Sequence, residues 1–237
     1  MPWRLKAEEI VPQAARELAA LFGEALRTVV VYGSAAGPGF DPRRSDVNLC
    51  AVAEPLEFTQ VARVAQWWSR WRRQRVAAPL LLSATDLERS LDVFPLEFLD
   101  LQARHRTLAG DELFAALRFA PESVRAECER EAKGKLLRLR GLYLELAGSG
   151  RDLRALMLDS RKTFLHVLRG LLYLRGETWQ GDGKAVVAAF ERHFGCRLPL
   201  LAALGESGAG VERNFAAYLA EIEAVATIAD REAQVGS

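Results

Sequence analysis

The sequence predicts an α+β domain at the N-terminus, followed by a domain built only from helices. Two buried strand patterns, over residues 29–31 and 47–52, lie in the first half of the chain. After Pro121 the strand signals stop, and long helical patterns joined by short glycine-containing connectors replace them. We therefore place the domain boundary after residue 118, with one domain over 1–118 and a helical bundle over 119–237.

The N-terminal half alternates helix and strand signals. Residues 7–26 carry apolar side chains at helical spacing, and the β-branched run 29–31 follows as a buried strand. Glycines and prolines within residues 35–44 predict a loop before the strand 47–52. The next expected elements are a helix over 58–75, a third strand over 78–83, and a short helix over 85–91 that Thr85 caps.

Residues 93–101 have two interpretations. Their composition favours an extended strand, whereas Pro95 would suit the first turn of a short helix. We prefer the extended form. In the second half, the pattern predicts four helices over 122–147, 152–175, 184–194 and 211–229.

The composition is that of a folded protein without a strong electrostatic field. Half of the 237 residues are hydrophobic, 27% are charged, and the net charge is +1. Cys50, Cys128 and Cys196 lie far apart and in no metal-ligand spacing, which favours free thiols in a reducing compartment. No apolar run reaches membrane-spanning length. We expect a cytoplasmic protein that has no membrane partner.

The residues with the clearest chemical pattern lie where the first two strands end and begin. Gly33 and Ser34 follow the strand 29–31, and Asp46 and Asn48 lie at the start of the next strand. Because side chains alternate across a strand, Asp46 and Asn48 share one face. Gly33 permits close approach of a phosphate, and the Ser34 hydroxyl can donate a hydrogen bond to it.

This order resembles the opening of the nucleotidyltransferase superfamily, the DNA polymerase β-like fold, and the antibiotic nucleotidyltransferases in particular. The resemblance implies an N-terminal nucleotidyltransferase-like domain with a small mixed sheet and a C-terminal helical bundle. In that superfamily a Gly-Ser turn holds a triphosphate, and two acids at Asp-x-Asp spacing hold magnesium. The resemblance implies that Gly33, Ser34 and Ser45 bind a nucleoside triphosphate, and that Asp46 and Asn48 bind Mg²⁺.

Asn48 departs from the family pattern, because an amide replaces the second acid. Magnesium prefers one or two carboxylates together with substrate phosphates, so a neutral oxygen weakens a two-ion site. The family's third acid has two candidates, Glu97 and Asp100, because the expected strand 78–83 carries leucines instead. We favour Glu97 as the catalytic partner of Asp46.

We consider three functional hypotheses, two of which follow from the resemblance. The first is a protein that binds a nucleoside triphosphate with Mg²⁺ and has weak or lost transfer activity. The second is an active nucleotidyltransferase that uses Asp46 and Glu97 on the hydroxyl of a small-molecule or protein acceptor. The third is a non-catalytic interaction or antitoxin-like module.

Two further patterns suggest other partners. Residues 67–75 interleave tryptophans with arginines, as nucleic-acid platforms do. Trp68 and Trp71 also fall on one helical stripe, so we interpret the segment as a helix packed on a sheet and expect no nucleic-acid partner. In the helical half, Arg161 and His166 have the Arg-x4-His spacing that resembles HEPN ribonucleases, although a solvated helix face would also explain them.

Overall fold

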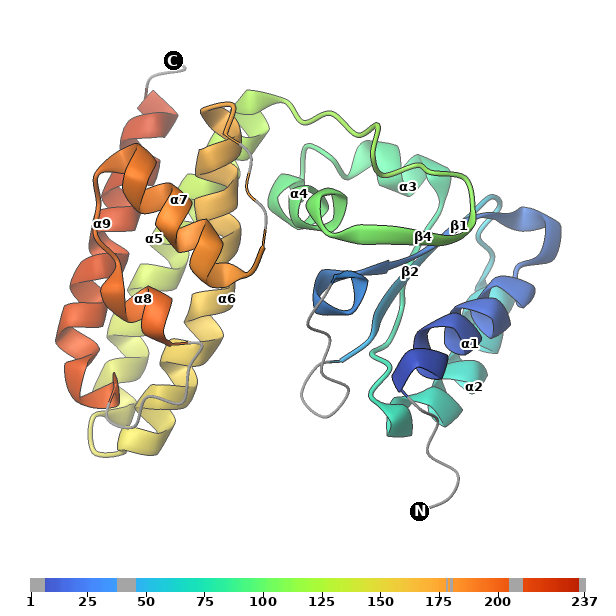
Figure 1. Cartoon of the computed structure of the whole chain (residues 1–237), viewed down its shortest axis with the longest axis horizontal. Coiled ribbons are helices and arrows are strands. Elements are labelled where there is room, and N and C mark those ends of the chain that lie inside the picture. The colour runs from blue at the N-terminus through green and yellow to red at the C-terminus, as the bar shows by residue number, and fades with distance from the viewer. Residues whose placement is uncertain (1–6, 38–45, 178, 180, 205–210, 235–237) are drawn as a thin grey trace. The chain divides into compact units, whose positions relative to one another are not determined.

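The computed structural model describes residues 7–37, 46–177, 179, 181–204 and 211–234 (Figure 1). The chain divides into two compact units. The first comprises Met1–Leu91 and Asp100–Arg118, and the second comprises Asp92–Leu99 and Phe119–Ser237. Residues 92–99 therefore belong with the helical unit, although they precede residue 118.

The first unit contains a four-stranded mixed sheet with the strand order β3-β2-β1-β4. Strand β1 is antiparallel to both of its neighbours, whereas β2 and β3 are parallel. The central strand β1 forms where three consecutive β-branched residues are fully buried, as expected for a strand covered on both faces. The strands are β1 (Leu26–Tyr32), β2 (Asn48–Ala53), β3 (Leu80–Leu82) and β4 (His105–Gly110).

Helices α1 (Ala7–Ala20) and α2 (Phe58–Trp71) lie on the same side of this sheet (Figure 1). They pack on the side chains of Val29 and Val31 and on alternate residues of β2. Trp67 and Trp71 are 1% and 4% exposed in this core, which confirms the packing interpretation of the tryptophan-rich segment. The expected stripe omitted Trp67, which is the more deeply buried of the two.

The expectation of an extended segment over 93–101 is wrong. Residues 95–101 belong to helix α4 (Pro95–Ala103). Its first residue is Pro95, and proline is favoured in the first turn of a helix. The strand β4 follows directly and was not predicted.

The short helix before α4 also starts differently from the expectation. Helix α3 (Ala84–Arg89) is capped by Ser83 rather than by Thr85. The Ser83 hydroxyl accepts from the Asp86 amide at 2.9 Å, and the Asp86 carboxylate accepts from the Ser83 amide at 3.0 Å. These reciprocal bonds satisfy two amides of the first turn.

The second unit is helical, as predicted for this half of the chain. Its long helices are α5 (Pro121–Leu146), α6 (Gly150–Leu174), α7 (Gly183–Phe194) and α9 (Phe215–Gln234), with the short α8 (Pro199–Ala203) between the last two. Helices α5, α6 and α9 pack against one another around apolar side chains such as Phe164 and Ile222. Among the described residues, no helix combines the length and apolar character that crossing a bilayer requires.

Candidate functional site

The glycine turn lies at the end of β1, next to the start of β2. Gly33 has a φ of +72°, in the left-handed region that favours glycine. Tyr32 pairs with Asn48 across the two strands. A Cβ atom added to Gly33 would lie 3.5 Å from Nδ2 of the Asn48 side chain. The Gly33 N–H donates to the Arg104 carbonyl at 2.9 Å. Gly33 therefore leaves room beside the turn and adopts its left-handed conformation. Its N–H is not available to a ligand, because it already donates to the Arg104 carbonyl.

The Ser34 side chain is exposed directly after this glycine. Asn48 is half-buried, and Asp46 is exposed two residues before it. Val47 between them is buried in the core, as the alternation along the strand predicts. The structure thus brings Gly33 and Asn48 together and leaves Ser34 and Asp46 open to solvent. Ser45 lies outside the described residues.

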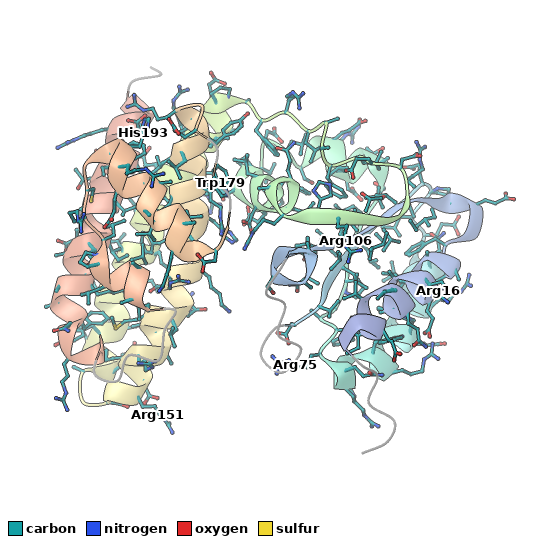
Figure 2. The ribbon with its side chains drawn as sticks, viewed as in Figure 1. Arg16, Arg75, Arg106, Arg151, Trp179 and His193 are labelled. Atoms are coloured by element: carbon teal, nitrogen blue, oxygen red, sulfur yellow. The ribbon has the colours of Figure 1, made fainter. Side chains whose placement is uncertain are left out.

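Asp46 has a cationic partner that the sequence pattern did not single out. Arg75 Nη2 lies 3.0 Å from Asp46 Oδ1, and both side chains are partly exposed. Arg75 (labelled in Figure 2) has a φ of 63°, a left-handed conformation that is rare for a residue other than glycine. The Val47 N–H donates to the Arg75 carbonyl at 2.8 Å, which fixes this residue beside the start of β2.

These residues do not fit a resident two-ion magnesium site. The formal charges of Asp46, Arg75 and Asn48 are −1, +1 and 0, so the group carries no net negative charge. Magnesium sites usually have one or two carboxylates to offset the charge of the ion. In the described part of the chain, no group of three or more His, Cys, Asp and Glu side chains is arranged to hold a metal ion.

The two candidates for a third acid lie in different units. Asp100 belongs to the first unit and accepts from Arg104 Nη2 at 2.8 Å. Glu97 belongs to the second unit, on helix α4 rather than on the strand that we expected. The prediction that Glu97 sits on a strand is wrong, because Pro95 begins a helix there. Its catalytic role stays a prediction.

Glu97 lines a pocket of about 210 Å³ within the second unit. The other polar residues of the pocket are Glu131, Lys162, Thr163 and His166. Burial raises the pKa of Glu97, and the nearby carboxylates of Glu127 and Glu131 raise it further. The pocket thus combines acids, an ammonium group, a hydroxyl and an imidazole, which together can bind a small polar molecule.

Arg161 and His166 have different neighbours. Arg161 Nε donates to the Leu201 carbonyl at 3.0 Å, whereas His166 lines the pocket with Glu97. Residues five apart on an α-helix are separated by about 140° around its axis, which accounts for the divergence. These contacts give no support to the HEPN-like interpretation.

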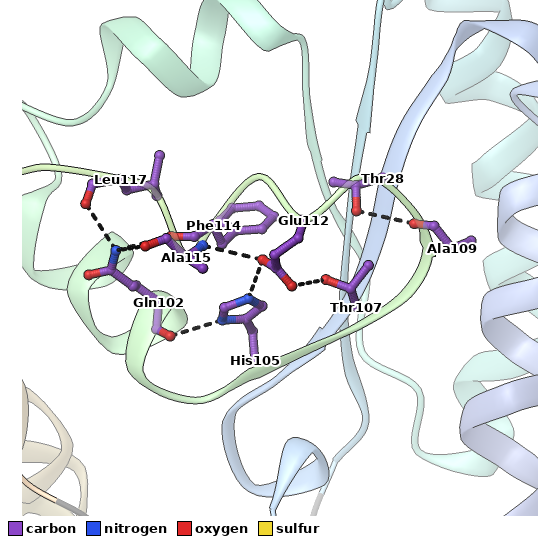
Figure 3. Close-up of polar contacts among 9 residues, drawn as sticks. All are labelled: Thr28, Gln102, His105, Thr107, Ala109, Glu112, Phe114, Ala115 and Leu117. Carbon is purple, nitrogen blue, oxygen red and sulfur yellow. Dashed lines mark hydrogen bonds and ion pairs between the residues drawn. The ribbon is translucent and has the colours of Figure 1, made fainter.

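A polar network surrounds His105, the first residue of β4 (Figure 3). His105, which pairs with Tyr32, contacts Glu112 at 2.7 Å through Nε2 and the Gln102 carbonyl at 2.9 Å through Nδ1. Burial tends to raise the pKa of Glu112, but hydrogen bonds from Thr107 and His105 and from a backbone amide outweigh it and lower the pKa to about 2. The network therefore contains an ionised carboxylate at neutral pH and fixes β4.

Comparison with known proteins supports the fold. No protein-family model matches the sequence, and no curated protein matches it either. Among solved structures, spectinomycin adenyltransferase AAD(9) from Enterococcus faecialis, with ATP and spectinomycin, matches with a TM-score of 0.55. The match covers 92% of this chain and 100% of that chain, at 12% sequence identity. This protein has the nucleotidyltransferase-like fold that the resemblance implied, with a small mixed sheet and a helical part.

Proposed function

We propose that this protein binds a nucleoside triphosphate at the Gly33 turn and that its nucleotidyl transfer is weak or lost. One observation carries the proposal: a left-handed Gly33 lies beside Asn48, with the Ser34 hydroxyl exposed next to it. The fold supports it, because the similar structure of AAD(9) was solved with ATP. The triphosphate would approach Gly33 closely and accept a hydrogen bond from Ser34, with Ser45 as a further donor.

The chemistry of Asp46 and Asn48 explains why transfer is expected to be weak. Asp46 and Asn48 are the side chains that would hold a magnesium ion, which would supply charge neutralisation for the phosphates. Asn48 brings no charge, and Asp46 is already paired with Arg75. Asp46 and Asn48 therefore offer too little negative charge to hold a second ion near the reacting oxygens.

An active transferase is the second candidate, and the pocket around Glu97 favours it. A carboxylate whose pKa is raised is a stronger base than an ordinary carboxylate, which suits a general base for an acceptor hydroxyl. The pocket would hold a small molecule with hydroxyl and amino groups, with Lys162 and Glu131 at its wall. If Glu97 is the base, Glu97→Gln should lower transfer about 100-fold or more and leave nucleotide binding intact. Equal transfer by Glu97→Gln and the exposed control Glu122→Gln would exclude this role.

A thermal-shift screen tests the binding proposal. The full chain is melted with ATP, GTP, CTP or UTP, each with and without Mg²⁺. A nucleotide at about 100 times its dissociation constant stabilises a protein by roughly 2.7 kcal/mol. We expect one or more nucleotides to raise the melting temperature, and Ser34→Asp to abolish the shift through repulsion of the phosphates.

Ser69→Asp is the matched control for this screen. It introduces the same charge at another exposed serine of the first unit, on helix α2. The nucleotide shift should survive in this variant. A shift in Ser34→Asp equal to that of the wild type, or no shift with any nucleotide, would overturn the proposed site.

A further inference from the structure

We infer that Arg75 binds the phosphates at this site, so that nucleotide binding does not require a divalent cation. The inference rests on the proposed function and concerns how the site balances the charge of its ligand. Three features carry it: the position of Arg75, the charge of its surroundings and the geometry of its side chain.

The backbone holds Arg75 at the end of the sheet where β1 runs into the glycine turn. The Val47 N–H donates to the Arg75 carbonyl at 2.8 Å, and the Ala77 N–H donates to the Val47 carbonyl at 3.0 Å. These bonds extend the sheet beyond β2, and Val47 bridges to Val76 in parallel. Because Asn48 at the start of β2 pairs with Tyr32, Arg75 and the turn that begins at Gly33 lie at the same end of the sheet, on either side of β2.

The charge around Arg75 favours an anion over a cation. The carboxylate of Asp46 lies 3.0 Å from the guanidinium, and Asn48 beside it carries no charge. The pair is therefore neutral, and its own charge does not attract a free divalent ion. A triphosphate carries several negative charges, so it can compete with the carboxylate of Asp46 for the guanidinium.

The Asp46–Arg75 pair is suited to such an exchange because it is not buried. The two side chains are 57% and 38% exposed, and exposed ion pairs are weak. A guanidinium also presents a planar fork that can donate two parallel hydrogen bonds to a phosphate. Arg75 would thus turn from Asp46 to the phosphates when a nucleotide binds, while its backbone stays in place.

A calorimetric titration with sodium tripolyphosphate, in EDTA and then in Mg²⁺, tests this inference on the full chain. This probe carries the phosphates without a base. The wild type should bind it in EDTA, and Arg75→Asn should weaken that binding roughly tenfold or more, as expected for loss of hydrogen bonds to a charged group. Asparagine tolerates the left-handed conformation, so this variant keeps the backbone. Its melting temperature checks that it folds.

Two further variants sharpen the test. Arg73→Asn removes a charge two positions away from Arg75, at an exposed residue, and should bind as the wild type does. Asp46→Asn removes the competitor of the phosphates, so it should bind tripolyphosphate in EDTA as well as the wild type or more tightly. A site that depends on metal predicts the opposite, because this variant removes the carboxylate of Asp46 as a metal ligand.

The outcomes separate the inference from the proposed function. Binding that needs Mg²⁺, is lost in Asp46→Asn and is unchanged in Arg75→Asn would overturn the inference and leave the proposed function standing. No binding of tripolyphosphate or of any nucleoside triphosphate in either buffer would overturn both.

Discussion

Arg75 and Asp46 form an ion pair at the start of β2, with Nη2 of the arginine 3.0 Å from Oδ1 of the aspartate. Asp46 is the remaining acid of the Asp-x-Asn pattern, and its partner in the structure is a side chain of the same unit. The nucleotidyltransferase-like fold of this chain therefore carries a neutral pair of charges at this position. This relationship links the expected loss of transfer to the proposed binding of phosphates by Arg75.

Asn48→Asp should restore a site for magnesium. The variant would add a carboxylate at the first residue of β2, two positions after Asp46, and two such carboxylates are ligands that magnesium favours. We expect the nucleotide-induced thermal shift to depend more strongly on Mg²⁺ than in the wild type, and transfer to any tested acceptor to rise. A Mg²⁺ dependence equal to that of the wild type would show that Asn48 does not face the phosphates.

Gly33→Ala should destabilise the first unit by about 1 kcal/mol, because a residue with a Cβ atom is strained at a φ of +72°. The new Cβ would make only an ordinary contact with Asn48, at 3.5 Å, so crowding adds little. Urea unfolding measures the change. Gly37→Ala is the control, because no atom lies within 4 Å of the added Cβ there. Equal stability of the two variants would contradict the conformational argument.

Glu112→Gln should destabilise the protein at neutral pH by about 1 kcal/mol, a modest amount because the carboxylate is partly exposed. The folded pKa of Glu112 is lowered from 4.5 to about 2, so its contribution is fully present above pH 4.5 and is lost as the pH falls toward 2. Urea unfolding of wild type and variant at pH 7, 4 and 2.5 should show a difference that shrinks with falling pH. A difference that stays constant would mean that the charge of Glu112 contributes nothing.

Tyr218→Phe should destabilise the helical unit by about 1 kcal/mol. The Tyr218 hydroxyl lies 2.7 Å from the Ser160 hydroxyl, and both side chains are fully buried. Chemical unfolding followed by helical circular dichroism measures the loss. The partly exposed Tyr143 provides the control, since Tyr143→Phe should change stability far less.

The sequence predicted the parts of the fold that local patterns determine. Residues 29–31 are all valine, a β-branched apolar residue that favours a strand buried on both faces of a sheet. Strand β1 forms there, and the three side chains are fully buried. The segment 93–101 was predicted wrongly because its composition suits either state; Pro95 at the first helical position decides it. Strand β4 was missed because its pairing with β1 is a contact between distant parts of the sequence.

The candidate site was predictable only in part, for a similar reason. Gly33 and Asn48 are close together because β1 and β2 pair, and the family resemblance had implied that these two residues belong to one site. Arg75 lies among several arginines at the end of α2, and nothing in the sequence separates it from them. Its left-handed backbone and its pairing with Asp46 depend on how the chain returns to the sheet.

The most direct test of the proposed nucleotide site is the dissociation constant of the nucleotide selected by the thermal-shift screen, measured for Ser34→Asp and Ser34→Lys. The two variants place opposite charges at the same exposed position. If the phosphates lie at the Gly33 turn, the aspartate should weaken binding roughly tenfold or more, and the lysine should tighten it. Dissociation constants that match the wild type in both variants would contradict the account.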